Sequence, residues 1–218
     1  NYQEALGFND IVRVVYADSK GSIWLGTSEN GVIRIEGNEF YQYKIENGLS
    51  GNDVLAILED HQGNFWFCTN GNGITYLKDQ EFIHFNEINK FSSDYVWSIM
   101  EDRKKNIWFG TNGSGIAKYD GNYFTYYTTR EGLSSDLILT MTEDTHDNIW
   151  IGTFNGGLIK FDGNSFHNFN TNDGLCNDIV WSILETPGGL WLGTERGISF
   201  MDLKDFSFQN YLKPEGLK

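Results

Sequence analysis

The sequence lacks the residues that mark several large classes of protein. Its 218 residues include only two prolines and two cysteines, and no stretch approaches the run of about eighteen apolar residues that a transmembrane helix needs. Cys68 and Cys176 form neither a metal-binding spacing nor an evident disulfide framework, so we expect two free thiols. No positively charged segment followed by an apolar run opens the chain, and we therefore expect a soluble chain.

Positive charge is also scarce. Lys and Arg together number 16 against 30 Asp and Glu, which gives a formal net charge of −14 and a sequence pI of about 4.5. Proteins that bind nucleic acids do so through basic surfaces, and anionic membranes select for the same feature. The composition therefore predicts no nucleic-acid partner and no membrane partner.

Signatures of common catalytic and cofactor sites are missing as well. The sequence contains no glycine-rich phosphate loop, and no Ser-His-Asp arrangement can be assembled from it. Its 4 histidines fall at unrelated places, which argues against a metal cluster. We therefore expect no cofactor, no metal and no enzymatic activity.

What the sequence does contain is a tryptophan motif that recurs along the whole chain. In four copies the tryptophan is followed, after one residue, by Gly-Thr, and in the second copy by Cys-Thr. The spacings between successive copies are 42, 42, 42 and 41 residues, a period typical of stacked supersecondary units. The tryptophans are Trp24, Trp66, Trp108, Trp150 and Trp191.

The fourth copy shows most clearly what one unit contains. Its β-rich segments at 136–144, 148–153, 158–161 and 165–169 are separated by tight turns, whose glycines permit hairpin geometry. Four short strands in about 42 residues, repeated in tandem, are typical of β-propeller blades. We place the repeats at about 1–45, 46–86, 87–128, 129–170 and 171–218, all within a single domain.

The architecture follows from what one unit can bury. A lone four-stranded sheet has two faces, and both faces here carry apolar or aromatic residues, so each unit must pack face to face against its neighbours. The sequence predicts an all-β fold, namely a β-propeller of five four-stranded antiparallel blades or a five-blade segment of a larger propeller. The ends, Asn1-Tyr2 and Pro214-Glu215-Gly216-Leu217, share the phase of internal junctions, which favours a chain cut from a longer array.

Positions at which the copies differ are the better candidates for function. In each copy an aspartate, replaced by Thr186 in the last copy, marks the turn after the first predicted strand. The residues five positions before it vary in size and charge, as expected beside a channel. They are Arg13, Leu55, Trp97, Leu139 and Trp181. Three residues before that turn, all copies are apolar, which predicts interblade core. These are Val15, Ile57, Ile99, Met141 and Ile183. Alternation along a strand does not show whether the side chains of the first, variable set point into the channel. The alternative to a functional role is that they fill the space beside the channel.

A polar segment precedes each predicted first strand and contributes the aspartates Asp10, Asp53, Asp94, Asp136 and Asp178. In a propeller these loops share one rim with the hairpins between the second and third strands, one of which contains Arg196. Carboxylates and tryptophan rings together suit a hydroxylated ligand such as a sugar. We predict that a small molecule or oligosaccharide binds at this rim, through Arg13, Trp97, Trp181, Asp53, Asp94, Asp136, Asp178 and Arg196. For the recurring aspartates, bonding to the loop backbone is the alternative.

Two other recurring sets have structural interpretations. A pair of carboxylates suffices for glycoside hydrolysis, but a catalytic pair breaks the symmetry of a repeat. The glutamates recur at one position, which favours a role in capping turns; they are Glu59, Glu101, Glu143 and Glu185. By the same reasoning the five recurring tryptophans belong to the core.

The fourth copy also resembles a known family. Gly132-Leu133, a hydrophobic strand, Glu143-Asp144, a turn, the tryptophan strand and Gly156-Gly157-Leu158 follow the pattern of the two-component regulator propeller repeat. The resemblance covers essentially the whole chain. It implies a periplasmic or extracellular propeller of a bacterial hybrid two-component sensor, which detects glycan breakdown products and signals to a kinase module on the parent chain.

The resemblance leaves the assembly and the output open. Such sensor propellers usually have seven blades, so further blades completing the ring, or a homo-oligomer, are expected partners. A stand-alone lectin-like or scaffold propeller without signalling output is the alternative function. A propeller lyase or glycosidase is a third.

Overall fold

The computed structural model describes residues 10–86, 91 and 93–212. The expectations for Asn1-Tyr2 and for residues 214–217 lie outside the described residues. Regular structure in the described part is β-strand apart from the short 3₁₀ turns η1 (Ile45–Asn47) and η3 (Thr171–Asp173). Neither of these helical turns has the length or the apolar run that crossing a bilayer requires.

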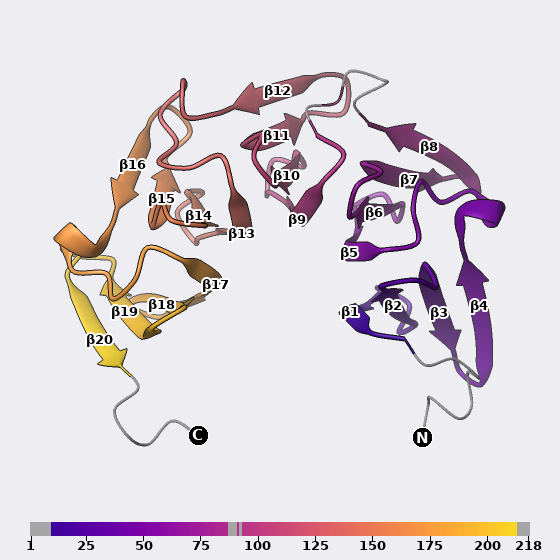
Figure 1. Cartoon of the computed structure of the whole chain (residues 1–218), viewed down its shortest axis with the longest axis horizontal. Helices are drawn as coiled ribbons and strands as arrows, with labels where there is room; N and C mark the ends of the chain where they lie inside the picture. Colours follow the sequence, from indigo (N-terminus) through magenta and orange to yellow (C-terminus); the bar gives the residue numbers. More distant parts are fainter. Residues whose placement is uncertain (1–9, 87–90, 92, 213–218) are drawn as a thin grey trace. The chain divides into compact units, whose positions relative to one another are not determined.

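The described strands form five four-stranded antiparallel sheets, in each of which sequential strands pair (Figure 1). Blade 1 comprises β1 (Val12–Ala17), β2 (Ile23–Thr27), β3 (Val32–Glu36) and β4 (Glu39–Tyr43). Blade 2 comprises β5 (Val54–Glu59), β6 (Phe65–Thr69), β7 (Ile74–Lys78) and β8 (Glu81–Phe85). Blade 3 comprises β9 (Val96–Glu101), β10 (Ile107–Thr111), β11 (Ile116–Tyr119) and β12 (Phe124–Tyr127).

The last two sheets repeat the same order. Blade 4 comprises β13 (Ile138–Glu143), β14 (Ile149–Thr153), β15 (Leu158–Phe161) and β16 (Phe166–Phe169). Blade 5 comprises β17 (Val180–Thr186), β18 (Gly189–Thr194), β19 (Gly197–Asp202) and β20 (Phe208–Leu212). Each sheet lies within one predicted repeat, and the predicted all-β fold with five propeller blades is confirmed.

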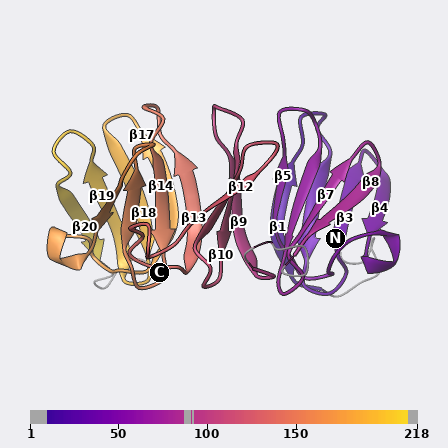
Figure 2. The same cartoon turned by 90° about the horizontal axis from the view of Figure 1, so that it is seen from above.

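The described chain divides into two compact units between Trp97 and Ser98. Blades 1 and 2 belong to the first unit, and blades 4 and 5 with nearly all of blade 3 belong to the second. Within each unit, turns gather at the two ends of the strands (Figure 2). We call the end with the interblade loops and the hairpins between second and third strands the rim, and the other end the base. The single-domain assignment stays a prediction.

Neighbouring blades within a unit pack through the same set of positions. In the first unit Trp24 and Val32 of blade 1 share a buried cluster with Val54, Ile57 and Phe67 of blade 2. In the second unit the matching clusters join blade 3 to blade 4 and blade 4 to blade 5. Their members include Trp108, Ile116, Ile138 and Met141, and Trp150, Leu158, Val180 and Leu190. Burial of these side chains is the main force that holds the blades together.

The tryptophans of the first four blades are buried together with a carboxylate. In each of these blades the indole N–H donates to the aspartate six residues earlier, at Nε1–Oδ2 distances of 2.8, 3.1, 2.8 and 2.7 Å. The pairs are Trp24–Asp18, Trp66–Asp60, Trp108–Asp102 and Trp150–Asp144. A buried indole needs such an acceptor. In blade 5 Thr186 stands in place of the aspartate, and Trp191 is only half-buried, so the predicted core role holds for four tryptophans and not for Trp191.

The recurring Gly-Leu dipeptide joins one blade to the next. Gly48 and Gly174 follow η1 and η3 with φ of 116° and 111°, a left-handed conformation that favours glycine and ends the turn. The next residues, Leu49 and Leu175, are buried in the interblade clusters. The dipeptide therefore reverses the chain and then seals the junction between two blades.

The prediction that Val15 belongs to an interblade core is wrong for the described residues. Val15 on β1 is 63% exposed, whereas its counterpart Ile57 on β5 is 5% exposed. Ile57 packs against blade 1, and β1 has no preceding blade among the described residues. The pattern of apolar residues identified the right face of the strand, but burial requires a neighbour on that face.

Candidate ligand-binding site

The variable position on the first strands lies at a β-bulge. The register between β1 and β2 shifts between Val12 and Val14, which leaves Arg13 without a paired residue on β2. Matching shifts leave Leu55, Leu139 and Trp181 unpaired on β5, β13 and β17. Because a bulge inserts one residue and re-aims its side chain, strict alternation could not indicate where these residues point. Trp97 occupies the same position of the repeat on β9 and is half-buried.

In the first unit two of the predicted site residues form an ion pair across blades 1 and 2. Arg13 Nε lies 3.1 Å from Asp53 Oδ1, and Arg13 Nη2 donates to Asp53 Oδ2 at 3.4 Å. Asn70, in the β6–β7 hairpin, donates from its amide to the same Oδ2 at 2.9 Å. Both charged side chains are partly exposed. The rim of this unit therefore presents a guanidinium, a carboxylate and an amide to solvent.

Asp53 does not occupy the position of the other predicted rim aspartates. The backbone carbonyls of Asn52, Asp94, Asp136 and Asp178 each accept a hydrogen bond from a hairpin glycine of the preceding blade, and these donors are Gly31, Gly73, Gly115 and Gly157. Asn52 is therefore the true counterpart, and Asp53 lies one residue further along. The other copies carry Ile11, Tyr95, Leu137 and Ile179 there. The sequence prediction grouped Asp53 with the other aspartates because of its residue type, and that grouping is wrong. In the correct register Asp53 is a charged residue at a position where the other copies are apolar or aromatic.

The side chains of Asp136 and Asp178 hold the interblade loops. Asp136 accepts from the backbone N–H of Thr129 at 2.7 Å and from its hydroxyl at 3.1 Å. Asp178 makes the same pair of bonds with Thr171, at 2.8 and 3.2 Å. The backbone-bonding alternative thus describes these two carboxylates. At Asp94 the carbonyl oxygen accepts from Gly71 and Gly73, which anchors the β6–β7 hairpin.

Asp10 plays a comparable role at the hairpin of blade 1. Its carboxylate accepts from the Ser28 hydroxyl and from the backbone N–H groups of Glu29 and Asn30. Partial burial opposes the charged form, but these hydrogen bonds outweigh it and hold the pKa of Asp10 well below its ordinary value. Asp10 is therefore ionised and committed to its own loop.

In the second unit the predicted residue Trp181 is open to solvent. It is 50% exposed, and its indole N–H donates to Glu195 Oε2 at 2.7 Å. Glu195 belongs to the turn between β18 and β19, next to Arg196, whose side chain is exposed. Glu195 was not among the predicted contacts, because nothing in the sequence indicates that the bulged Trp181 reaches this turn. The rim of blade 5 thus offers an aromatic ring, a carboxylate and a guanidinium.

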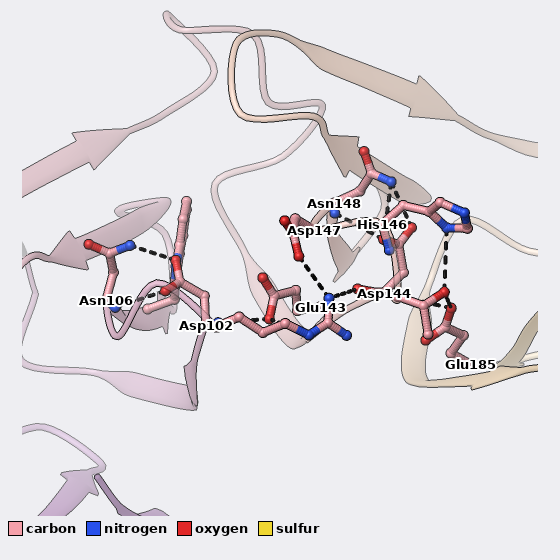
Figure 3. Close-up of polar contacts among 11 residues, drawn as sticks. Asp102, Asn106, Glu143, Asp144, His146, Asp147, Asn148 and Glu185 are labelled. Carbon is pink, nitrogen blue, oxygen red and sulfur yellow. Dashed lines mark hydrogen bonds and ion pairs between the residues drawn. The ribbon is translucent and has the colours of Figure 1, made fainter. Parts of the chain in front are cut away.

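The recurring glutamates lie at the base, where they join adjacent blades. In the second unit Glu143 accepts from the backbone N–H of Arg103 at 2.9 Å, and the Arg103 guanidinium lies 2.8 Å from Asp147 (Figure 3). In the first unit Glu59 accepts from the backbone N–H and the hydroxyl of Ser19, at 2.6 and 2.7 Å. The predicted capping role is confirmed for Glu59, Glu143 and Glu185, and each of these three caps a turn of the preceding blade.

The described residues show no group that would serve as a metal centre. Within residues 10–86, 91 and 93–212, no three His, Cys, Asp or Glu side chains are placed to hold a metal ion. Cys68 and Cys176 are buried free thiols, and burial raises the pKa of Cys68 far above its ordinary value. The exposed rim residues named above offer hydrogen bonding, ion pairing and ring stacking.

Solved structures share this fold. The extracellular domain of BT3049 from B. thetaiotaomicron, described as a hybrid two-component system, is 28% identical over 96% of this chain, with a TM-score of 0.83. The extracellular domain of BT4673 from the same organism, described in the same way, is 22% identical over 98% of the chain, with a TM-score of 0.81. The chain spans only 29% and 32% of these two proteins.

A propeller enzyme is also similar in fold. Virginiamycin B lyase from Staphylococcus aureus is 16% identical over 95% of the chain and 74% of the lyase, with a TM-score of 0.74. At this identity the likeness extends to the fold alone. A search among curated proteins finds no match.

Fold and interblade contacts define the chain as a β-propeller. Four of its segments, at residues 5–29, 48–71, 90–113 and 132–155, match the family model for the two component regulator propeller. Each segment ends just after the tryptophan-containing strand of a blade. The chain therefore carries two-component regulator propeller repeats, and the predicted resemblance is confirmed.

Proposed function

We propose that this chain is the ligand-sensing propeller portion of a bacterial two-component receptor and lies outside the cytoplasm. The observation that carries the proposal is its 28% identity, over 96% of its length, to an extracellular domain of a protein described as a hybrid two-component system. Because the chain spans 29% of that protein, the kinase module and the signalling output belong to other parts of the receptor.

The proposed ligand is an oligosaccharide bound at the rim. Trp181 exposes half of its surface beside the Glu195 carboxylate, and Arg13 and Asp53 pair beside Asn70. A sugar ring places its C–H face on an aromatic ring and its hydroxyls on carboxylates, amides and guanidinium groups. These exposed residues differ from copy to copy, whereas the buried ones repeat, so selectivity for a ligand belongs to the rim residues.

Titration calorimetry with a panel of neutral and acidic oligosaccharides tests this proposal. We expect Trp181→Ala to weaken binding at least tenfold while the melting temperature stays within a few degrees. Tyr123→Ala is the matched control, because Tyr123 is a 76% exposed aromatic residue at the base of blade 3 and should leave affinity unchanged. Equal loss in both variants, or unfolding of Trp181→Ala, would contradict the site.

The same titration separates the rival functions. Binding without turnover supports a sensor or a lectin-like module, and the parent gene then distinguishes these two through the presence of a kinase. Release of reducing ends from the oligosaccharide would indicate an enzyme. Indifference to the whole panel would favour a scaffold.

A further inference from the structure

A pocket lies at the base of the first unit, between blades 1 and 2, at the end of the strands opposite the rim. Its volume is about 540 Å³, within the range of pockets that hold small molecules. Its lining comes from the β1–β2, β5–β6 and β7–β8 turns and from side chains on the adjoining strands. None of the residues predicted from the sequence as ligand contacts belongs to it.

The repeat provides an internal comparison, because blades 3 and 4 form the equivalent groove. That groove holds only about 100 Å³. The two grooves share an aromatic floor, with Trp24 and Tyr43 in one and Trp108 and Tyr127 in the other. The difference in volume must therefore arise from the residues around this floor.

Two opposite differences distinguish the walls of the grooves, because Phe65 and Leu77 of the larger groove stand where the smaller groove has Ile149 and Phe161. In the smaller groove the ring of Phe161 packs 5.8 Å from Trp108 and 5.5 Å from Tyr127, measured between centroids. Leu77 holds the equivalent position in the larger groove, and its side chain is smaller than a phenyl ring. The chain thus contains a closed and an open version of the same groove.

A further substitution acts at the mouth. The Arg103 guanidinium donates to the Asp144 carbonyl and pairs with Asp147, a residue that lines the smaller groove. Its counterpart in blade 1 is Ser19, whose short side chain turns to Glu59. The mouth of the groove between blades 1 and 2 is therefore left without this long side chain.

The interior wall of the open groove is aromatic and fixed in place. Ring centroids lie 4.2 Å apart for Trp24 and Phe65 and 5.9 Å apart for Trp24 and Tyr43. The Arg34 guanidinium lies over the Trp24 ring, 5.4 Å from its centroid, and pairs with Glu36 at 2.9 Å. These contacts pre-organise the wall, so that a ligand does not have to order it.

The mouth carries polar side chains that are free to bind a ligand. Lys20, Asp79 and Gln80 line the pocket and are exposed, and within the described residues their side chains form no hydrogen bond or ion pair. Asp79 and Gln80 adopt φ of 50° and 67° because they are the two central residues of the tight hairpin between β7 and β8. This left-handed conformation is less favourable for them than for glycine.

The charges of the pocket identify the class of ligand. The exposed charges at its mouth, Lys20 and Asp79, are of opposite sign, and Arg34 is already paired with Glu36, so the mouth favours neither an anion nor a cation. Aromatic walls with an amide, an amine and a carboxylate at the mouth suit a hydroxylated ring. We propose that the groove between blades 1 and 2 binds a neutral mono- or disaccharide, at a site separate from the rim and independent of it.

Calorimetric titration of the full chain with maltose, cellobiose, lactose and xylobiose tests this site. We expect at least one of these sugars to bind, and Leu77→Phe, which copies the closed groove, to weaken that binding at least tenfold. Leu77→Met is the volume-conserving control and should stay within threefold of the original affinity. Gln80→Gly should also weaken binding while raising the melting temperature, because it removes the amide and relieves the left-handed strain.

The outcomes separate this proposal from that for the rim. Trp181→Ala should leave binding in the groove unchanged, so loss of binding in Trp181→Ala alone would assign the sugar to the rim and overturn the groove site. Binding that is equally strong in Leu77→Phe, or no binding of any of the four sugars, would also overturn it. If Leu77→Phe fails to fold, Gln80→Gly and Asp79→Ala take its place. Weaker sugar binding in these two variants supports the groove site, and unchanged binding overturns it.

Discussion

Glu185 of blade 5 caps the first turn of blade 4 through Thr145. Its Oε1 accepts from the Thr145 backbone N–H at 3.0 Å and from the Thr145 hydroxyl at 2.8 Å (Figure 3). The same contact links Glu59 to Ser19 in the first unit. In both pairs the carboxylate accepts hydrogen bonds from N–H and hydroxyl groups in a turn of the preceding blade. At the base of each unit, polar bonds therefore add to the apolar core between the blades.

The first prediction concerns this interblade cap. Glu185→Ala should lower the free energy of unfolding by about 1–3 kcal/mol, because the Thr145 N–H and hydroxyl lose an ionised acceptor. Urea denaturation measures the change. Glu81→Ala, at an exposed position on β8, serves as the control and should stay within about 0.5 kcal/mol of the original protein. Equal effects of the two substitutions would show that the cap contributes nothing to stability.

The second prediction concerns the pH dependence that the buried aspartates impose. Burial opposes ionisation of Asp144, but the bonds from Trp150, Asn148 and His146 outweigh it and lower its pKa. A carboxyl whose pKa is lower in the folded state stabilises the protein above its unfolded pKa, near 3.9, and this contribution is lost as the pH falls through the folded value.

Asp144→Asn isolates that contribution. The variant should be less stable than the original protein at pH 7, and the difference between their free energies of unfolding should shrink as the pH falls below about 4. Urea denaturation at a series of pH values from neutral to acidic gives both curves. A difference that stays constant across the series would mean that ionised Asp144 has no part in acid sensitivity.

The third prediction contrasts two tryptophans of similar size and different environment. Trp150 has no exposed surface and donates to Asp144, whereas Trp181 is 50% exposed. Trp150→Ala should cost about 3–5 kcal/mol, as truncation of a core aromatic residue does. Trp181→Ala should cost much less, and thermal unfolding of both variants measures the contrast. A comparable loss in Trp181→Ala would make Trp181 a structural residue.

Periodic features of this chain could be predicted from sequence because they depend on residue type alone. The period of the tryptophans gave the blade count, and the recurrence of Glu59 and Glu143 gave their capping role. Trp191 departed from the pattern because its burial depends on a neighbouring face, which no residue type encodes.

Features of the candidate sites depend instead on backbone register and on size differences between copies. β-Bulges change the direction in which Arg13 and Trp181 point. The pattern of alternating apolar and polar residues does not reveal the extra residue that a bulge adds to a strand. Asp53 was aligned by its residue type, whereas the bonds of Asn52 define the register. The open groove has Leu77 where the smaller groove has Phe161, and the sequence alone does not show how the rings around these two residues are placed.

The fourth prediction separates two costs of replacing a glycine. Gly73 and Gly37 both have left-handed backbones, with φ of 72° and 61°. A Cβ at Gly73 would lie 2.1 Å from the Phe85 carbonyl oxygen, whereas a Cβ at Gly37 would meet nothing within 4 Å. Gly37→Ala should therefore cost about 1–2 kcal/mol, the price of the left-handed conformation alone.

Gly73→Ala should cost distinctly more, above about 3 kcal/mol, because the backbone must move away from Phe85. That movement also strains the bond from the Gly73 N–H to the Asp94 carbonyl, now 2.7 Å long, which ties the β6–β7 hairpin to the loop before β9. Urea denaturation of the two variants gives the difference directly. Equal costs would mean that the hairpin relaxes freely and that its bond to Asp94 does not fix the rim.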